Sequence, residues 1–150
     1  MKTTIQSLVF AAAISLLPFT AIAHSSDHEA VDAVMKKFMS AYITADNTLA
    51  TEVFRKDGVM IGYSVARGSE LLTRTGEQFA EGFNGKPAAD EAKRKRSYEI
   101  VDMAENLAAV RVMLDYPGWR GVDYVVLLKV DGKWMIMSKS WTGTLTQKPA

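Results

Sequence analysis

Two apolar runs on either side of Asp131-Gly132, near the C-terminal end, form the clearest hydrophobic pattern of the chain. An Asp-Gly pair in that setting is a strong sequence signal for a tight β-hairpin. The first run, residues 122–130, is apolar at both parities, so both faces of this strand need a cover. The pattern therefore predicts a hairpin at the centre of a sheet, with something packed on each face.

Shorter runs of the same character predict the remaining strands. We expect strands at about 59–63, 96–103, 107–116, 122–130 and 134–142. The pairs Glu105-Asn106 and Pro117-Gly118 supply turn residues between three of them. Most of the sheet should therefore be an antiparallel meander.

Helical spacing of apolar residues predicts three helices in the first half of the chain. The first begins at a capping box, Ser26 to Glu29, and buries one stripe of side chains: Val31, Val34, Met35, Phe38, Met39 and Tyr42. A short second helix begins at Asp46 or Asn47, continues through Phe54, and ends at Lys56-Asp57-Gly58. The third is capped by Ser69 or the residue before it, and its buried residues are Leu71, Leu72, Phe79 and Phe83. This order predicts an α+β fold, with helices on one face of a largely antiparallel sheet of four to six strands.

Residues 1–23 have the pattern of a cleavable signal peptide. Lys2 precedes an apolar run from about Ile5 to Ile22, and Ala21-Ile22-Ala23 places small residues before the cut. Polar residues and a proline interrupt the run, which makes it short for a membrane span. We therefore expect residues 24–150 to form one exported domain, periplasmic or secreted, without membrane attachment after cleavage.

Composition limits the partners of this domain. The chain has 18 basic and 17 acidic residues, and Lys2 belongs to the predicted signal peptide, so the mature domain would carry no net charge. Neutrality gives no general attraction to nucleic acid, and we interpret the basic run 93–96 as a solvated loop that enters a strand. The chain contains no cysteine, so the fold depends on its core and has no disulfide framework.

The C-terminal hairpin also carries a family resemblance. It reads Asp123-Tyr124 before an apolar strand, then Asp131-Gly-Lys-Trp-Met-Ile136, with Lys139 near the end. Together with the order of elements, this pattern resembles the nuclear transport factor 2-like superfamily, and within it the small proteins grouped as "Putative lumazine-binding" or SnoaL-like. The likeness extends from Ala30 to about Trp141. It implies a cone-shaped, curved sheet with three N-terminal helices on its concave face, a pocket between them, and frequently a homodimer.

One segment departs from the pattern of that superfamily. Arg55-Lys56-Asp57-Gly58 stands where such domains often carry a turn similar to His-Pro-Asp-Ala. No role is therefore transferred to a histidine at this place.

The homodimer can be argued from the residues as well. Three helices cover only one side of a sheet, yet residues 122–130 are apolar on both. In the next strand we expect Trp134 and Ile136 on one face, with Met135, Met137 and Trp141 on the other. A second subunit on the outer face would cover these side chains. The alternative cover is the C-terminal tail, residues 144–150.

Candidate pocket residues are drawn from helices and strands alike. They are Phe38, Tyr42, Phe54, Met60, Tyr63, Phe79, Tyr98, Arg111, Asp123 and Lys139. Arg111 in a pocket would hold a ligand carboxylate, although we favour a cross-strand ion pair on the outer face for it. Four tyrosines are candidate donors to a ligand carbonyl, and each is also a common kind of core residue with its hydroxyl at the rim: Tyr42, Tyr63, Tyr98 and Tyr116.

Two main classes of function stay open. The favoured one is a pocket that binds a small apolar or aromatic molecule, with no catalytic set, cofactor or metal. The other is an enzyme of the isomerase, dehydratase or cyclase kind, which would use a buried carboxylate, Asp102, Asp115 or Asp123, with a tyrosine. A carboxylate in an enclosed cavity within reach of a polar partner would favour the enzyme. A third class is an assembly module with a collapsed pocket. His24 and His28, near the predicted mature N-terminus, are a sparse ligand set for a metal.

Overall fold

The computed structural model describes residues 19–64 and 68–146, with side chains from Ser26 onward except that of Ser64. The predicted signal peptide, residues 1–23, lies mostly outside the described residues. None of the helices in the described part of the chain is long and apolar enough to cross a membrane.

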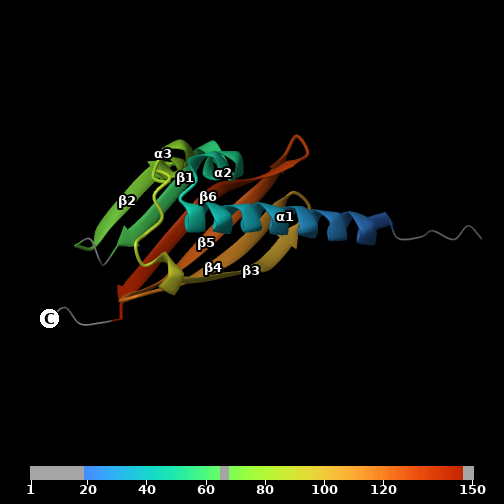
Figure 1. Ribbon diagram of the computed structural model, residues 1–150. Coiled ribbons are helices and arrows are strands. Elements are labelled where there is room, and N and C mark those ends of the chain that lie inside the picture. Colours follow the sequence, from blue (N-terminus) through green and yellow to red (C-terminus); the bar gives the residue numbers. More distant parts are fainter. Residues whose placement is uncertain (1–18, 65–67, 147–150) are drawn as a thin grey trace, which may run out of the picture.

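Six strands form one sheet, and the helices lie on one side of it (Figure 1). The elements in chain order are α1 (Phe19–Thr44), α2 (Asn47–Val53), β1 (Phe54–Ser64), β2 (Glu70–Thr75), α3 (Gly76–Ala80), the 3-10 helix η2 (Glu91–Lys93), β3 (Lys95–Ala104), β4 (Leu107–Tyr116), β5 (Trp119–Val130) and β6 (Lys133–Leu145). The strand order is β2-β1-β6-β5-β4-β3, and only the β1–β6 pair is parallel. The predicted α+β class and the largely antiparallel sheet are confirmed.

The central hairpin folds as the hydrophobic pattern predicts. Asp131 and Gly132 have φ angles of 51° and 78°, and Val130 pairs directly with Lys133, which defines a two-residue turn. Positive φ at both turn positions matches the right-handed twist of the flanking strands. Residues 122–130 occupy the middle of the sheet as β5, with β4 on one side and β6 on the other.

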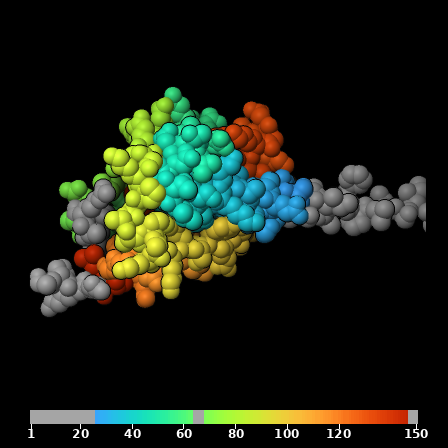
Figure 2. Space-filling model, in the orientation of Figure 1, coloured from blue at the N-terminus to red at the C-terminus, as the bar shows by residue number. Residues whose placement is uncertain are grey.

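The hydrophobic core lies between the concave face of the sheet and the helices. α1 contributes Met35 and Phe38, both fully buried, and the sheet contributes Val125, Leu127 and Ile136 from its two central strands. Asp27 of α1 binds the hairpin, since its Oδ1 accepts hydrogen bonds from Lys129 Nζ at 2.7 Å and Trp134 Nε1 at 3.1 Å. Figure 2 shows the segment between α3 and β3, in yellow, packed against α1, in cyan.

The segment after β1 corrects one prediction. Residues 70–75 form the edge strand β2 and no helix, because Leu71 and Leu72 alternate between the two faces of the sheet and Leu71 is 67% exposed. The third helix begins only at Gly76, where Thr75 and Gln78 form a reciprocal capping box. Ser69, the predicted cap, lies in a turn with φ of 63°. A Thr-x-x-Gln signal was therefore present in the sequence and marks the true start.

Two helix boundaries also differ from prediction. α1 begins at Phe19, so Ser26 lies inside the helix and does not cap it. α2 has its predicted cap, Asp46, whose side chain accepts from the backbone of Thr48 and Leu49, but Phe54 is the first residue of β1. Lys56-Asp57-Gly58 lies within β1, at an irregularity in its pairing with β6, and ends no helix.

The convex face of the sheet exposes apolar side chains, and the homodimer stays a prediction. Tyr124, Met113 and Val101 are exposed there, and Val122 and Val126 are partly exposed between them. The alternative to a second subunit was the C-terminal tail, residues 144–150, as a cover for this face. Thr144 and Leu145 belong to β6, which leaves only a short tail. Residues 147–150 lie outside the described residues.

We expect the protein to sediment as a dimer at micromolar concentration and Tyr124→Asp to shift it to the monomer, since a carboxylate in an apolar interface loses its hydration. Thr48→Asp, at an exposed position of α2, is the matched control and should leave the dimer intact. Sedimentation velocity decides the matter: a wild-type monomer at every accessible concentration would rule out the dimer.

Candidate ligand-binding site

A pocket of about 310 Å³ opens on the concave side of the sheet, between the strands, α1 and α3. It is lined by Tyr42 from α1, Leu72 and Arg74 from β2, Phe79 from α3, Leu114 and Tyr116 from β4, Trp119 and Asp123 from β5, and Lys139 and Trp141 from β6. Its walls are therefore mainly aromatic, and its polar side chains are two cations, one carboxylate and two tyrosines, beside the indole N–H groups of the two tryptophans. A cavity with apolar walls and few convergent polar groups is the usual form of a small-molecule site.

A β-bulge in β6 brings Lys139 and Trp141 into this pocket. Val126 pairs with Ser138 but Leu127 pairs with Ile136, so Met137 is one extra residue in β6. Because side chains alternate along a strand, one extra residue reverses the face of everything that follows it. Trp134 and Ile136 face the core before the bulge, and Lys139 and Trp141 face the same side after it. The predicted position of Trp141 on the opposite face to Trp134 is therefore wrong.

Three strand glycines provide the floor on which the two pocket tryptophans lie. A Cβ on Gly62 would come within 1.9 Å of the Trp141 indole, its partner across the β1–β6 pair. Gly121 and Gly143 face each other across β5 and β6, and a Cβ on either would come within 1.9 Å or 2.1 Å of the Trp119 indole. Both indoles thus lie flat against the sheet, which only glycine permits at these positions.

At the base of the pocket lies a buried ion pair. Lys139 Nζ is 2.8 Å from Asp123 Oδ2, and the two side chains are 3% and 1% exposed. The other carboxylate oxygen, Asp123 Oδ1, is also buried and has no hydrogen-bond partner among the described residues. Burial raises the pKa of Asp123, although Lys139 opposes the shift, and burial lowers the pKa of Lys139, although Asp123 opposes it. In both residues the desolvation of the charged form is thus the largest influence.

Aromatic rings surround the ammonium group of this pair. Lys139 Nζ lies 4.3 Å from the centroid of the Trp141 ring and 5.0 Å from that of Phe79. Such cation–π contacts partly replace the lost hydration of the ammonium. The ammonium is therefore enclosed by its carboxylate partner and two aromatic rings, and Asp123 Oδ1 is a buried acceptor without a partner among the described residues.

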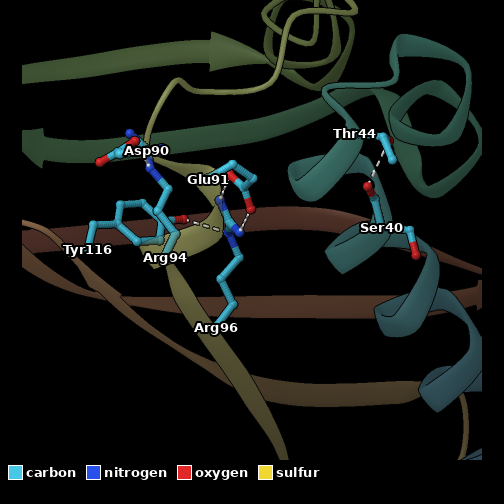
Figure 3. Close-up of polar contacts among 7 residues, drawn as sticks. All are labelled: Ser40, Thr44, Asp90, Glu91, Arg94, Arg96 and Tyr116. Carbon is cyan, nitrogen blue, oxygen red and sulfur yellow. Dashed lines mark hydrogen bonds and ion pairs between the residues drawn. The ribbon is translucent and has the colours of Figure 1, made fainter.

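A second hollow of about 320 Å³ adjoins the pocket and shares four of its residues, Tyr42, Arg74, Phe79 and Tyr116. On its far side Arg96 binds both oxygens of Glu91 and donates from Nε to the Tyr116 hydroxyl at 2.8 Å (Figure 3). Arg94 forms an ion pair with Asp90, and its Cζ lies 4.5 Å from the centroid of the Tyr116 ring. The Tyr116 oxygen already accepts from Arg96, so its own hydrogen is available to a ligand.

The structure brings together four of the ten predicted pocket residues: Tyr42, Phe79, Asp123 and Lys139. Phe38, Phe54 and Met60 lie in the core beneath the helices and line no part of this pocket. Tyr63, 45% exposed, pairs with Thr142 and Leu71 on the convex side.

Tyr98 and Arg111 are the remaining two predicted residues. The Tyr98 hydroxyl donates to Asp32 Oδ1 at 2.6 Å and ties β3 to α1. Arg111 forms the cross-strand ion pair favoured from the sequence, with its Nη2 2.7 Å from Glu99 Oε2 on the convex face. Neither lines the pocket.

The candidate set drawn from the sequence left out six of the residues that line the pocket: Leu72, Arg74, Leu114, Tyr116, Trp119 and Trp141. The available signal for Trp119 was glycine inside apparent strands, at Gly121 and Gly143, because such glycines often mark a close approach of another group. Leu72 and Arg74 were missed because residues 70–75 were predicted as a helix and not as a strand beside the pocket.

The part of the chain that the structure describes contains no group of three or more His, Cys, Asp or Glu side chains placed to hold a metal ion. His28 is exposed on α1, and the side chain of His24 lies outside the described ones.

A helix-covered, curved α+β sheet with an aromatic pocket defines the class of protein, and the comparisons with known proteins agree. Residues 26–142 match the family model "Putative lumazine-binding", and the chain belongs to that family. The resemblance noted in its C-terminal hairpin is thereby confirmed. No curated protein matches the sequence.

Solved structures share the fold at low sequence identity. An NTF2-like protein of unknown function from Silicibacter pomeroyi is 21% identical, with a TM-score of 0.67, over 79% of this chain and 96% of that one. One from Shewanella baltica is 22% identical, with a TM-score of 0.67, over 82% and 98%. A Putative Scytalone Dehydratase from Novosphingobium aromaticivorans is 15% identical, with a TM-score of 0.58, over 87% and 95%. These likenesses establish the nuclear transport factor 2-like fold.

Proposed function

We propose that this protein binds a small, flat aromatic molecule with polar ring atoms in the pocket above Asp123 and Lys139. The observation that carries the proposal is the buried ion pair at the base of aromatic walls, with Asp123 Oδ1 left without a partner. A purely apolar ligand would leave that oxygen unsatisfied. A ring that offers an N–H group would satisfy it.

The buried ion pair of Asp123 and Lys139 is not explained by a gain in the stability of the fold. Burial disfavours the charged form of both members, and buried ion pairs are often no better than apolar residues of the same volume. An unpartnered buried oxygen adds a further unfavourable contribution. A bound ligand that donates to Asp123 Oδ1 and stacks on Trp141 and Trp119 would offset both.

Lumazine is a suitable first probe, because it is a flat bicyclic ring with N–H and C=O groups and gives the family its name. Trp119 and Trp141 line the pocket, so we expect saturable quenching of tryptophan fluorescence on titration. Asp123→Asn should weaken binding about tenfold, the effect of losing one charge-assisted hydrogen bond.

Glu99→Gln is the matched control, since Glu99 is a carboxylate in an ion pair on the convex face. It should leave the affinity for lumazine unchanged. A folded protein whose fluorescence shows no saturation up to millimolar lumazine, or whose affinity falls equally in both variants, would contradict the proposal.

The second candidate function is an enzyme that moves a proton on a carbonyl compound. It is favoured by one observation: the carboxylate of Asp123 has a free oxygen in a pocket that also holds the hydroxyls of Tyr42 and Tyr116. Burial raises the pKa of Asp123, which strengthens it as a general base. Mass spectrometry of a cyclic ketone, recovered after incubation with the protein in D2O, separates the candidates: deuterium uptake above that in Asp123→Asn indicates catalysis, and its absence leaves binding alone.

A further inference from the structure

The hollow beside the pocket is rich in cationic side chains. Arg74, Lys86, Arg94 and Arg96 line it, against the single carboxylate of Glu91. Two of these cations are already compensated, because Arg94 is paired with Asp90 and Arg96 with Glu91. Arg74 and Lys86 have no carboxylate partner among the described side chains, so the wall carries a positive surplus.

Arg74 stands where the two hollows meet. It lies on β2, pairs with Met60 of β1, and Met60 pairs in turn with Lys139 of β6. This row of cross-strand neighbours puts Arg74 on the concave face at the edge of the sheet, two strands away from the buried ion pair. Its side chain lines the pocket and the second hollow alike.

Tyr116 adds a directed donor on the same shared wall. Its oxygen accepts from Arg96 Nε, and Arg96 is only 6% exposed and fixed by Glu91 (Figure 3). Burial raises the pKa of Tyr116, with Arg96 and Arg94 opposing the shift, so the hydroxyl keeps its proton. A guanidinium and a neutral hydroxyl that face one space are the groups that bind a carboxylate or another anionic oxygen group.

We infer that the two hollows form one elongated site, whose ligand carries its aromatic ring above Asp123 and Lys139 and an anionic group, a carboxylate in its simplest form, beside Arg74. The inference rests on the proposed function and specifies the class of ligand. An anionic ligand is compatible with the nearby carboxylate of Asp123, because Lys139 compensates the charge of Asp123 and so removes the repulsion between Asp123 and the anion. Tyr42 lines both hollows, as Arg74 does, and Lys86 lines the second hollow alone.

A matched pair of probes tests it on the full protein by isothermal titration calorimetry. Lumazine-6-carboxylate and lumazine-6-carboxamide share a ring and differ by one charge. We expect the carboxylate to bind about tenfold more tightly, and Arg74→Gln to remove that preference while the affinity for the carboxamide stays the same. The preference should also shrink at high salt, because Arg74 is exposed to solvent.

Arg120→Gln is the control, since Arg120 is an exposed arginine paired with Asp115 away from the pocket. It should leave the preference intact. Equal affinity of the two probes for the wild type, or an equal loss of both in Arg74→Gln, would overturn the inference and leave the proposed function standing. A protein that binds neither probe would overturn both.

Discussion

Replacement of Asp123 alone by leucine is expected to lower the free energy of unfolding by about 3–5 kcal/mol, because it leaves the Lys139 ammonium buried without its carboxylate. Lys139→Met alone should have an effect of the same order, for the converse reason. The double variant Asp123→Leu/Lys139→Met is expected to be within about 1 kcal/mol of the wild type, or more stable. Urea denaturation of all four proteins measures the cycle.

The two single variants should differ in how stability depends on pH. In Asp123→Leu the folded protein holds Lys139 with a lowered pKa, so the unfolded chain binds more protons below the ordinary lysine value of 10.5. The free energy of unfolding then rises with pH between the lowered pKa and 10.5, and the loss of stability relative to the wild type shrinks toward pH 10.5.

In Lys139→Met the carboxyl of Asp123 keeps a raised pKa in the folded state. The folded protein therefore binds more protons above the ordinary aspartate value of 3.8, and stability falls as pH rises above it. The double variant should show neither slope. Equal slopes in the two single variants, or a double variant as unstable as their sum, would contradict the description of the pair.

The second large effect is expected at Gly62. Gly62→Val places methyl groups in the space of the Trp141 indole, since a Cβ alone would come within 1.9 Å of it. The indole must leave the floor of the pocket, which should lower stability by about 1–3 kcal/mol and weaken lumazine binding about tenfold through loss of the stacking wall. A shift of tryptophan emission toward longer wavelength reports the displacement.

Two controls separate this effect from general damage to the sheet. Ser140→Val adds a similar side chain to an exposed position of β6, one residue from Trp141 in sequence, and should change neither binding nor emission. In a Trp141→Leu background, Gly62→Val should lower stability by much less than in the wild type, because the indole is gone. A full penalty in that background would show that the clash with Trp141 is not the cause.

The sequence predicted the fold well where its patterns are regular. Asp131-Gly132 marked the hairpin because its turn requires two positive φ angles. Arg111 was expected in a cross-strand ion pair on the outer face, and it lies there, paired with Glu99.

Prediction failed where one residue changes the periodicity. Met137 resembles its apolar neighbours, so nothing in the sequence distinguishes the bulge that turns Lys139 and Trp141 toward the pocket. Leu71-Leu72 fits a helix or an edge strand equally, and the choice hid Arg74. The candidate site is therefore only partly predictable, because its residues come from six elements and their meeting depends on that bulge and on the glycine floor.

One measurement tests the central claim most directly: the affinity for lumazine of the double variant Asp123→Leu/Lys139→Met, by calorimetry, beside the wild type. The two proteins are expected to be similarly stable, so a difference in affinity reports recognition and not folding. We expect the double variant to bind at least about tenfold more weakly, because the acceptor for the ring N–H is gone. Equal affinity in a folded double variant would contradict the claim that the buried pair recognises the ligand.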